Sequence, residues 1–196
     1  EKIINQMWGN YGRILAEYPF LEKFKKNKLN QFLKIEGAEY LTEVIKNKKQ
    51  AVFISGHFNN FELMAMEIEK SNINLAAIYR PLNNFFLNGI MENIRKKHIC
   101  KMQIKKGKNG TRELLRLFKN GYSVALMIDQ RVSEGLQINL FNRKCFTTTI
   151  PAQLVKKYNC EIIPVYVERE DKVNFKIHFY KPLIFEDSSS IEDITW

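Results

Sequence analysis

Short apolar runs and longer helix-type segments alternate through the middle of the chain, and this order restricts the possible folds more than any other feature. The apolar runs are residues 51–55, 74–79, 102–104, 122–128 and 161–167, and the helix-type segments are residues 61–70, 84–97, 110–119 and 151–158. A repeated β-α-β order predicts an α/β fold in which helices flank a largely parallel central sheet. The first runs are apolar throughout, as buried parallel strands are, whereas residues 174–180 alternate, as a strand with one wetter face does.

The rest of the chain is consistent with one domain built on that sheet. Residues 3–18 and 38–48 are predicted to form two further amphipathic helices, the first of which ends at Pro19. No repeat, low-complexity tract or linker divides the 196 residues, and their 45% hydrophobic content is enough for one core. We expect a single domain over residues 1–196. Because the sequence begins with Glu1 and ends in a new acidic segment, we also expect a fragment of a longer protein.

Charge and cysteine content limit the partners and the compartment. The formal net charge is +10 and the pI is about 9.4, a balance that attracts nucleic acid, an anionic membrane surface, a phosphorylated ligand or an acidic carrier protein. Cys100, Cys145 and Cys160 are far apart and odd in number, which predicts a reducing compartment rather than a disulfide framework. No run approaches the roughly 18 apolar residues that a membrane span needs.

Polar clusters stand where three of the predicted strands end. The clusters SGH, YRP and DQR follow the runs 51–55, 74–79 and 122–128. Ligands of open α/β sheets bind at the carboxyl ends of the strands, so these clusters predict an active site at that edge.

His57 and Glu62 are the candidates for acid–base chemistry there. On a continuous helix five residues turn through about 500°, which would point the two side chains roughly 140° apart. A working pair therefore needs His57 in the loop, and Gly56 permits the tight exit from the strand. Glu62 would then accept from one imidazole nitrogen and leave the other as a base. The alternative is a capping box in which Asn59 is the N-cap and Glu62 its partner.

Other polar residues near these strand ends have both a functional and a structural interpretation. Arg80 is either an anion or carbonyl clamp or a surface arginine in a turn. Arg95 lies in the basic helix end IRKKH, where a cation also suits the helix dipole. Asp129 ends a buried strand and is either a site residue or a cap. Asn83 and Asn84 can cap the helix that follows them.

Signals for other chemistry are weaker. His98 and Cys100 are only two candidate metal ligands without a second pair, so no metal site is predicted. GKNGTRE lacks the GKS or GKT ending of a phosphate loop, and no G-x-S-x-G motif is present. The segment YPFLEKFKKNKLNQF, in which cations alternate with aromatic residues, fits an anionic membrane surface, nucleic acid or a plain helix exterior.

The ordered blocks of the sequence resemble a known family. The blocks occur in the order GHFNNFE, YRPLNN, DQR followed by LF, T-T and P-A-x-L, and then IIPVY. This ordered set resembles the lauroyl/myristoyl-type lipid A late acyltransferases, part of the lysophospholipid acyltransferase superfamily. The resemblance covers nearly the whole chain. It implies an acyltransferase in which His57 and Glu62 form the H-x4-D/E motif, the histidine acting as base and the carboxylate orienting it. It also implies substrate-binding positions at Arg80, Asn83, Asn84, Arg95, Asp129, Gln130 and Arg131.

The resemblance further implies the reaction and its setting. The acceptor hydroxyl would attack the thioester of an acyl carrier protein directly, with no metal or bound cofactor. The implied partners are this carrier protein, a phosphorylated glycolipid acceptor and an anionic membrane surface, not nucleic acid, at the cytoplasmic face of the bacterial inner membrane. Family members often carry an N-terminal membrane anchor and a further C-terminal segment, and we expect this fragment to lack both.

Three alternatives to this assignment remain open. The acceptor could be a lysophospholipid or a phosphoinositide mannoside. The same base could activate water, which would make the protein a thioesterase. A basic α/β nucleic-acid-binding domain without catalysis would show salt-dependent binding to any duplex and no effect of replacing His57.

Overall fold

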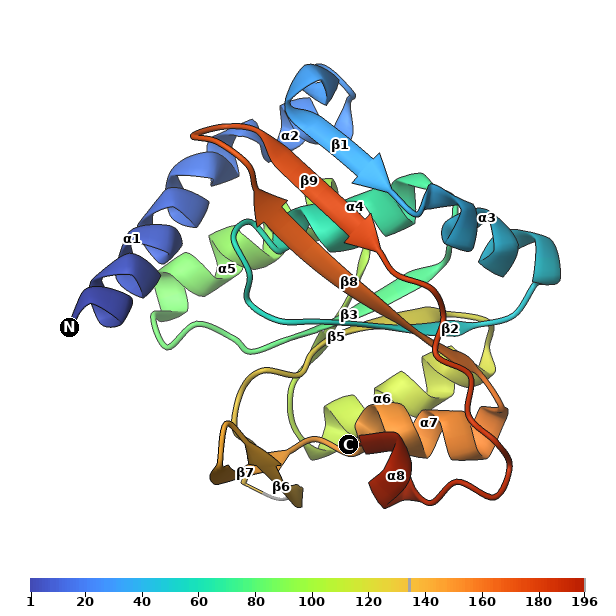
Figure 1. Ribbon diagram of the computed structural model, residues 1–196. Coiled ribbons are helices and arrows are strands. Elements are labelled where there is room, and N and C mark those ends of the chain that lie inside the picture. The colour runs from blue at the N-terminus through green and yellow to red at the C-terminus, as the bar shows by residue number, and fades with distance from the viewer. Residues whose placement is uncertain (134, 196) are drawn as a thin grey trace.

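The computed structural model describes residues 1–133 and 135–195, and its centre is a seven-stranded sheet (Figure 1). The strand order is β1-β9-β8-β2-β5-β3-β4, in which β8 and β9 are antiparallel and the other neighbours are parallel. The strands are β1 Leu33–Glu36, β2 Ala51–Ser55, β3 Leu75–Tyr79, β4 Met102–Lys105, β5 Ser123–Met127, β8 Glu161–Arg169 and β9 Phe175–Phe179. The predicted α/β fold with a largely parallel sheet is confirmed.

Helices pack on both faces of the sheet, over two hydrophobic clusters. Alternate residues of β2 belong to different clusters, since Phe53 packs in one and Val52 in the other. Figure 1 draws the helices of the first cluster above β2, β3 and β5 and those of the second below these strands. The first cluster is covered by α1 (Lys2–Glu17), α2 (Leu21–Lys25), α3 (Ala38–Asn47), α4 (Glu62–Lys70) and α5 (Phe85–Ile94), and the second by α6 (Lys108–Lys119), α7 (Ile150–Tyr158) and α8 (Ile191–Thr195).

The structure also contains elements that the sequence pattern did not predict. A short hairpin, β6 (Leu136–Leu140) with β7 (Arg143–Thr147), lies apart from the main sheet. The predicted helix over 84–97 is α-helical only to Ile94 and continues as a π-helical turn, η3 (Arg95–Ile99). Two 3-10 turns, η1 (Tyr18–Phe20) and η2 (Asn30–Phe32), flank α2. Within the described ranges, no helix is both long and apolar enough to cross a membrane.

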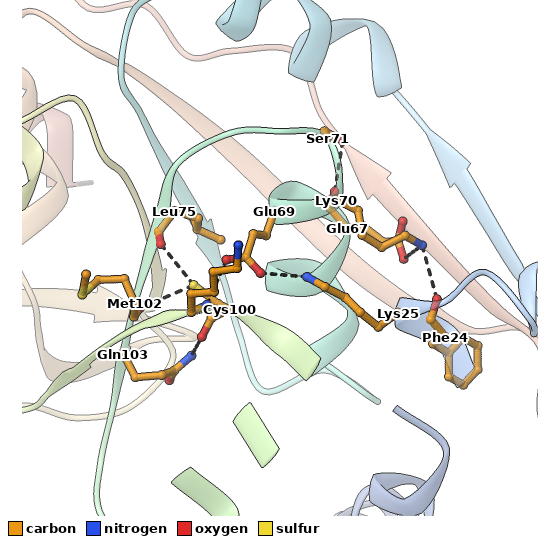
Figure 2. Close-up of polar contacts among 11 residues, drawn as sticks. Phe24, Lys25, Glu67, Glu69, Lys70, Ser71, Leu75, Cys100, Met102 and Gln103 are labelled. Atoms are coloured by element: carbon orange, nitrogen blue, oxygen red, sulfur yellow. Dashed lines mark hydrogen bonds and ion pairs between the residues drawn. The ribbon is translucent and has the colours of Figure 1, made fainter. Parts of the chain in front are cut away.

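The helix α4 matters most for the site, because it begins at Glu62, and polar contacts fix its other end (Figure 2). Glu69 accepts a hydrogen bond from Lys25 Nζ at 2.7 Å, and this pair ties α4 to α2. Lys70 Nζ donates to Glu67 Oε1 at 2.6 Å and to the carbonyl oxygen of Phe24 at 3.4 Å. Burial raises the pKa of Glu67, although Lys70 opposes the shift.

Cys100 belongs to the same packed region. Its thiol donates to the carbonyl oxygen of Leu75 at 3.1 Å (Figure 2), and burial raises the pKa of the thiol to about 12. A thiol with such a pKa is not a nucleophile at neutral pH, so Cys100 acts as a core residue.

Candidate active site

The register of two parallel strands brings His57 and Asp129 together. Ser55, the last residue of β2, pairs with Met127, the last residue of β5, and each strand is followed two residues later by a polar side chain. His57 Nδ1 lies 2.8 Å from Asp129 Oδ1, and the backbone N–H of His57 donates to Asp129 Oδ2, also at 2.8 Å. Both carboxylate oxygens therefore hold the histidine.

Gly56 makes this close approach possible. A Cβ at this position would lie 2.8 Å from ring carbons of Phe58 and 3.1 Å from Asp129 Oδ2. Real Cβ atoms essentially never come as near as the first of these distances, so a larger residue would displace either the ring or the loop. Gly56 therefore permits the tight turn after β2, as the sequence predicted, and also leaves room for the carboxylate of Asp129.

The electrostatics of the pair keep Asp129 ionised. Burial by itself would raise the pKa of Asp129, but the hydrogen bonds from the side chain and backbone of His57 outweigh it and hold this pKa below its usual value. An ionised Asp129 favours the tautomer in which Nδ1 carries the proton, and Nε2 is then the free basic nitrogen. The side-chain Nε2 of Gln130 lies 3.5 Å from His57 Nε2.

Glu62 is held by different partners from those the sequence predicted. Its Oε1 accepts from Nε and Nη2 of Arg95, at 2.9 and 2.7 Å, and from the hydroxyl of Tyr18. His57 and Glu62 do not hydrogen-bond to each other, and Asp129 takes the orienting position that we expected for Glu62. The reason is that β5 lies next to β2 in the sheet, which spacing along the chain does not reveal.

The alternative capping box is not formed. The N-cap of α4 is Phe61 and makes no side-chain cap hydrogen bond, and Glu62 is the first helical residue. Asn59 has a left-handed backbone with φ of 45°, and its Nδ2 donates to the carbonyl oxygen of Val167 at 3.0 Å. This alternative fails because Asn59 bonds to β8 and not to its own helix.

Arg95 stands at the junction of α5 and the π-helical turn. Its guanidinium lies 5.8 Å from the centre of the Tyr79 ring and donates to Glu62 Oε1. Burial would lower the pKa of Arg95, but Glu62 and Tyr18 outweigh it and raise this pKa, so the side chain stays charged. The ion pair, rather than the helix dipole, therefore sets its position.

A pocket of about 1010 Å³ lies at the carboxyl ends of the strands. Its size suits a large ligand, since ligand pockets typically measure roughly 300–1,000 Å³. Six of the nine predicted site residues line it: His57, Glu62, Arg80, Asn83, Arg95 and Gln130. The strand-end clusters therefore do meet at one edge, as the β-α-β order predicted.

The other three predicted site residues do not line the pocket. Asp129 contacts the pocket only indirectly, because it hydrogen-bonds to His57, which lines the pocket. Asn84 caps α5, because its Oδ1 accepts from the backbone N–H groups of Phe86 and Leu87 at 3.1 and 3.2 Å. The guanidinium of Arg131 lies 5.9 Å from the centre of the Phe146 ring in β7.

Sequence reasoning missed two contributors to the site. Lys106 lines the pocket. It directly follows β4, as Arg80 directly follows β3, and the two residues lie at the same level of the sheet because Tyr79 pairs with Lys105. The two lysines that follow the predicted strand 102–104, Lys105 and Lys106, were a signal that could have found it. Tyr18 gave no such signal, because it lies 44 residues from Glu62.

In the part of the chain that the structure describes, no three His, Cys, Asp or Glu residues cluster to hold a metal ion.

A comparison with protein families identifies the class of enzyme. The family model for bacterial lipid A biosynthesis acyltransferases matches residues 1–196, the full length of the chain. No curated protein matches the sequence. The chain belongs to the bacterial lipid A biosynthesis acyltransferase family and is an acyltransferase.

Proposed function

We propose that the protein transfers a fatty acyl chain from the thioester of an acyl carrier protein to a hydroxyl of a lipid A precursor, with His57 as the base. The observation that carries the proposal is that His57, held by Asp129, lines a pocket large enough for a lipid substrate. No metal ion or bound cofactor takes part in the reaction that we propose.

The proposed reaction is a direct transfer. His57 Nε2 takes the proton of the acceptor hydroxyl while the hydroxyl oxygen attacks the thioester carbonyl carbon. The tetrahedral intermediate then collapses, the C–S bond breaks, and the carrier thiol leaves with the proton from the imidazolium. A positioned base of this kind accelerates such a step by about 10²- to 10⁴-fold.

Cations along the pocket support the same proposal. Arg80, Arg95 and Lys106 line the cavity, and they would stabilise the oxyanion of the intermediate or bind a phosphate of the acceptor. Glu62 fixes Arg95 in place. The net charge of +10 also suits an acidic carrier protein as partner.

An exposed apolar surface supports a location at the cytoplasmic face of the bacterial inner membrane. On α5, Phe85 and Phe86 are 87% and 84% exposed, and on α1 Ile3 and Trp8 are 80% and 65% exposed. Amphipathic helices with such residues bind at the lipid interface, and the positive net charge favours anionic headgroups. Leu82 lines the pocket only three residues before Phe85, so a lipid acceptor would enter the pocket from this surface.

The first test is acyl transfer from a panel of acyl carrier protein thioesters, in membranes that contain the full-length protein. The acceptors would be a lipid A precursor, a lysophospholipid, a phosphoinositide mannoside and water alone. We expect product with the lipid A precursor and its loss in folded, expressed His57→Ala and Glu62→Ala variants. His178→Ala is the matched control, because His178 bonds to Glu36 and Glu168 away from the pocket.

Each outcome separates the alternatives. Activity that survives His57→Ala would contradict the mechanism. Product only with a lysophospholipid or a mannoside would change the acceptor, and release of free acid without an acceptor would indicate a thioesterase. Asp129→Asn should also reduce turnover, because an amide no longer favours the tautomer with a free Nε2.

A further inference from the structure

Glu17 at the end of α1 and the next residue, Tyr18, contact Asn60 in the loop after β2 and Glu62 at the start of α4. Glu17 Oε2 accepts a hydrogen bond from Asn60 Nδ2 at 2.8 Å, and the hydroxyl of Tyr18, the next residue, donates to Glu62 Oε1. Successive helical residues point about 100° apart, so one helix end can hold two points of a loop. Neither Glu17 nor Tyr18 lines the pocket, so neither meets a substrate there.

An ion pair with a buried arginine side chain fixes Glu17. Its Oε1 accepts from Nη1 of Arg169, the last residue of β8, at 2.6 Å. The Arg169 side chain is 5% exposed, and its guanidinium lies 4.5 Å from the centre of the Phe175 ring. Within the described residues, Nε and Nη2 of Arg169 have no hydrogen-bond partner, so the burial of this cation is only partly compensated. Such a pair adds little net stability, and a role in fixing geometry accounts better for its presence.

Asn60 depends on Glu17 for its position. Asn60 is 1% exposed, and among the residues described its side chain makes a single hydrogen bond, the one to Glu17, while its Oδ1 has no partner. The preceding residue, Asn59, is held by the carbonyl oxygen of Val167 in β8. The loop that carries His57 is thus tethered to α1 on one side and to β8 on the other.

Tyr18 and Arg95 donate to the same oxygen of Glu62. Burial, together with the negative charge of Glu62, raises the pKa of Tyr18 above its usual value, so its hydroxyl remains a donor. With Arg95, it directs three hydrogen bonds to Oε1. No donor in the described part of the chain hydrogen-bonds to Oε2, and Glu62 lines the pocket. Oε2 is therefore the oxygen that stays available to a substrate.

We propose that Glu17 and Tyr18 are positioning residues, which act through Asn60 and Glu62 to hold the loop from His57 to Glu62 in the shape that the reaction needs. The inference rests on the proposed acyl transfer by this loop. It assigns the end of α1 to the catalytic unit, although nothing in the sequence around it resembles a catalytic motif.

A single-atom deletion tests Tyr18. Tyr18→Phe keeps the buried ring and removes the hydroxyl, and we expect kcat to fall about 10-fold with KM within about twofold, because the lost hydrogen bond joins a charged carboxylate. Tyr40→Phe is the matched control. Tyr40 packs against the same core and lies outside the pocket, and its hydroxyl makes no hydrogen bond among the described residues. Equal kcat values in the two variants would overturn the role of Tyr18.

A graded series tests Glu17. Glu17→Ala should lower kcat about 10-fold by releasing Asn60, and Glu17→Gln should recover part of this loss because its amide oxygen can still accept one hydrogen bond. Glu22→Gln, at an exposed pair with Lys26, controls for the change of charge. If Glu17→Ala folds and its kcat equals that of Glu22→Gln, Glu17 has no positioning role.

Hydrogen exchange gives a readout that does not require turnover. The backbone amides of residues 56–61 should exchange faster in Tyr18→Phe and Glu17→Gln than in either control. If the unmodified protein acylates none of the acceptors, the proposed function fails, while faster exchange in these two variants still supports the positioning of the loop. Exchange as slow as in the controls would overturn the inference, whatever the acceptor.

Discussion

The helices α4 and α5 lie on the same side of the sheet, and their burial is opposite to what their sequences favour. ELMAMEIEK of α4 carries three carboxylates and a lysine, yet seven of its residues, from Glu62 to Ile68, are buried. FFLNGIMENI of α5 is far more apolar, and none of its residues is fully buried.

The difference shows that position in the fold, rather than apolar content, decides burial. α4 packs between the sheet and α2, and each of its four charged side chains has a partner of opposite charge. α5 packs only Met91 and Ile94 against the core. α5 therefore leaves an apolar surface exposed to water, and we propose that this surface binds at the lipid interface.

The largest expected effect is on folding, at α4. Leu63 is fully buried and outside the pocket, and Leu63→Ala should lower the free energy of unfolding by about 2–5 kcal/mol through lost burial and a cavity. Phe86→Ala on α5 should change it by less than about 0.5 kcal/mol. Urea unfolding of both variants measures the contrast, and similar losses would remove the distinction between the two helices.

The next effect is on membrane binding, at α5. Phe85→Ala combined with Phe86→Ala should weaken binding to vesicles of phosphatidylglycerol and phosphatidylethanolamine by about 100-fold, since each phenyl ring contributes about 1.5 kcal/mol or more when buried in an apolar medium. Vesicle co-sedimentation measures the change. Ile184→Ala is the control, because Ile184 is also highly exposed but lies outside α1 and α5. Unchanged binding in the double variant would place the lipid contact elsewhere.

A smaller effect concerns the cap of α5. Asn84→Ala removes the acceptor for two backbone N–H groups and should cost about 1 kcal/mol of local helix stability. Because α5 has no fully buried residue, we expect faster amide exchange along α5 while the midpoint of global unfolding stays the same. Asn84→Asp, which keeps an acceptor, should behave as the unmodified protein does. A fall in the global midpoint would show that α5 is part of the cooperative core.

The smallest effect concerns charge within α4. Burial raises the pKa of Glu67 above its value in the unfolded chain, so the stability linked to this carboxyl is complete below about pH 4.3 and is lost as the pH rises through the folded-state pKa. Glu67→Gln should therefore raise the free energy of unfolding at pH 7, by less than about 1 kcal/mol, and leave it unchanged near pH 4. Denaturant unfolding at both pH values measures this. Lower stability at pH 7 would mean that the pair with Lys70 outweighs burial.

Much of the fold followed from local patterns. The strand predicted at 51–55 has those bounds, and the other predicted strands agree within two residues, because buried parallel strands are continuously apolar. β1 was missed because its four residues, LKIE, are short and half polar at the edge of the sheet. The β6–β7 hairpin was missed because its turn uses Phe141 and Asn142 at positive φ, without the glycine that usually signals such a turn.

The site was predictable in its location but not in its pairing. Strand ends meet at one edge of any parallel sheet, so the polar clusters after β2, β3 and β5 had to converge. Which side chains then touch depends on strand order, and β5 enters the sheet between β2 and β3 although it comes later in the chain. Asp129 is 72 residues from His57, and no local pattern could reveal that contact.

The ion pair of Glu17 and Arg169 also has a consequence for how the enzyme is made. The two residues are 152 positions apart, so a ribosome working at 5–20 residues per second needs roughly 8–30 s to add the second after the first. A nascent chain that has already exposed His57 still lacks the strand to which Asn59 and Glu17 attach. Interrupted translation should therefore yield chains that lack the contacts we propose to position His57, and catalytic competence would begin only when β8 has emerged.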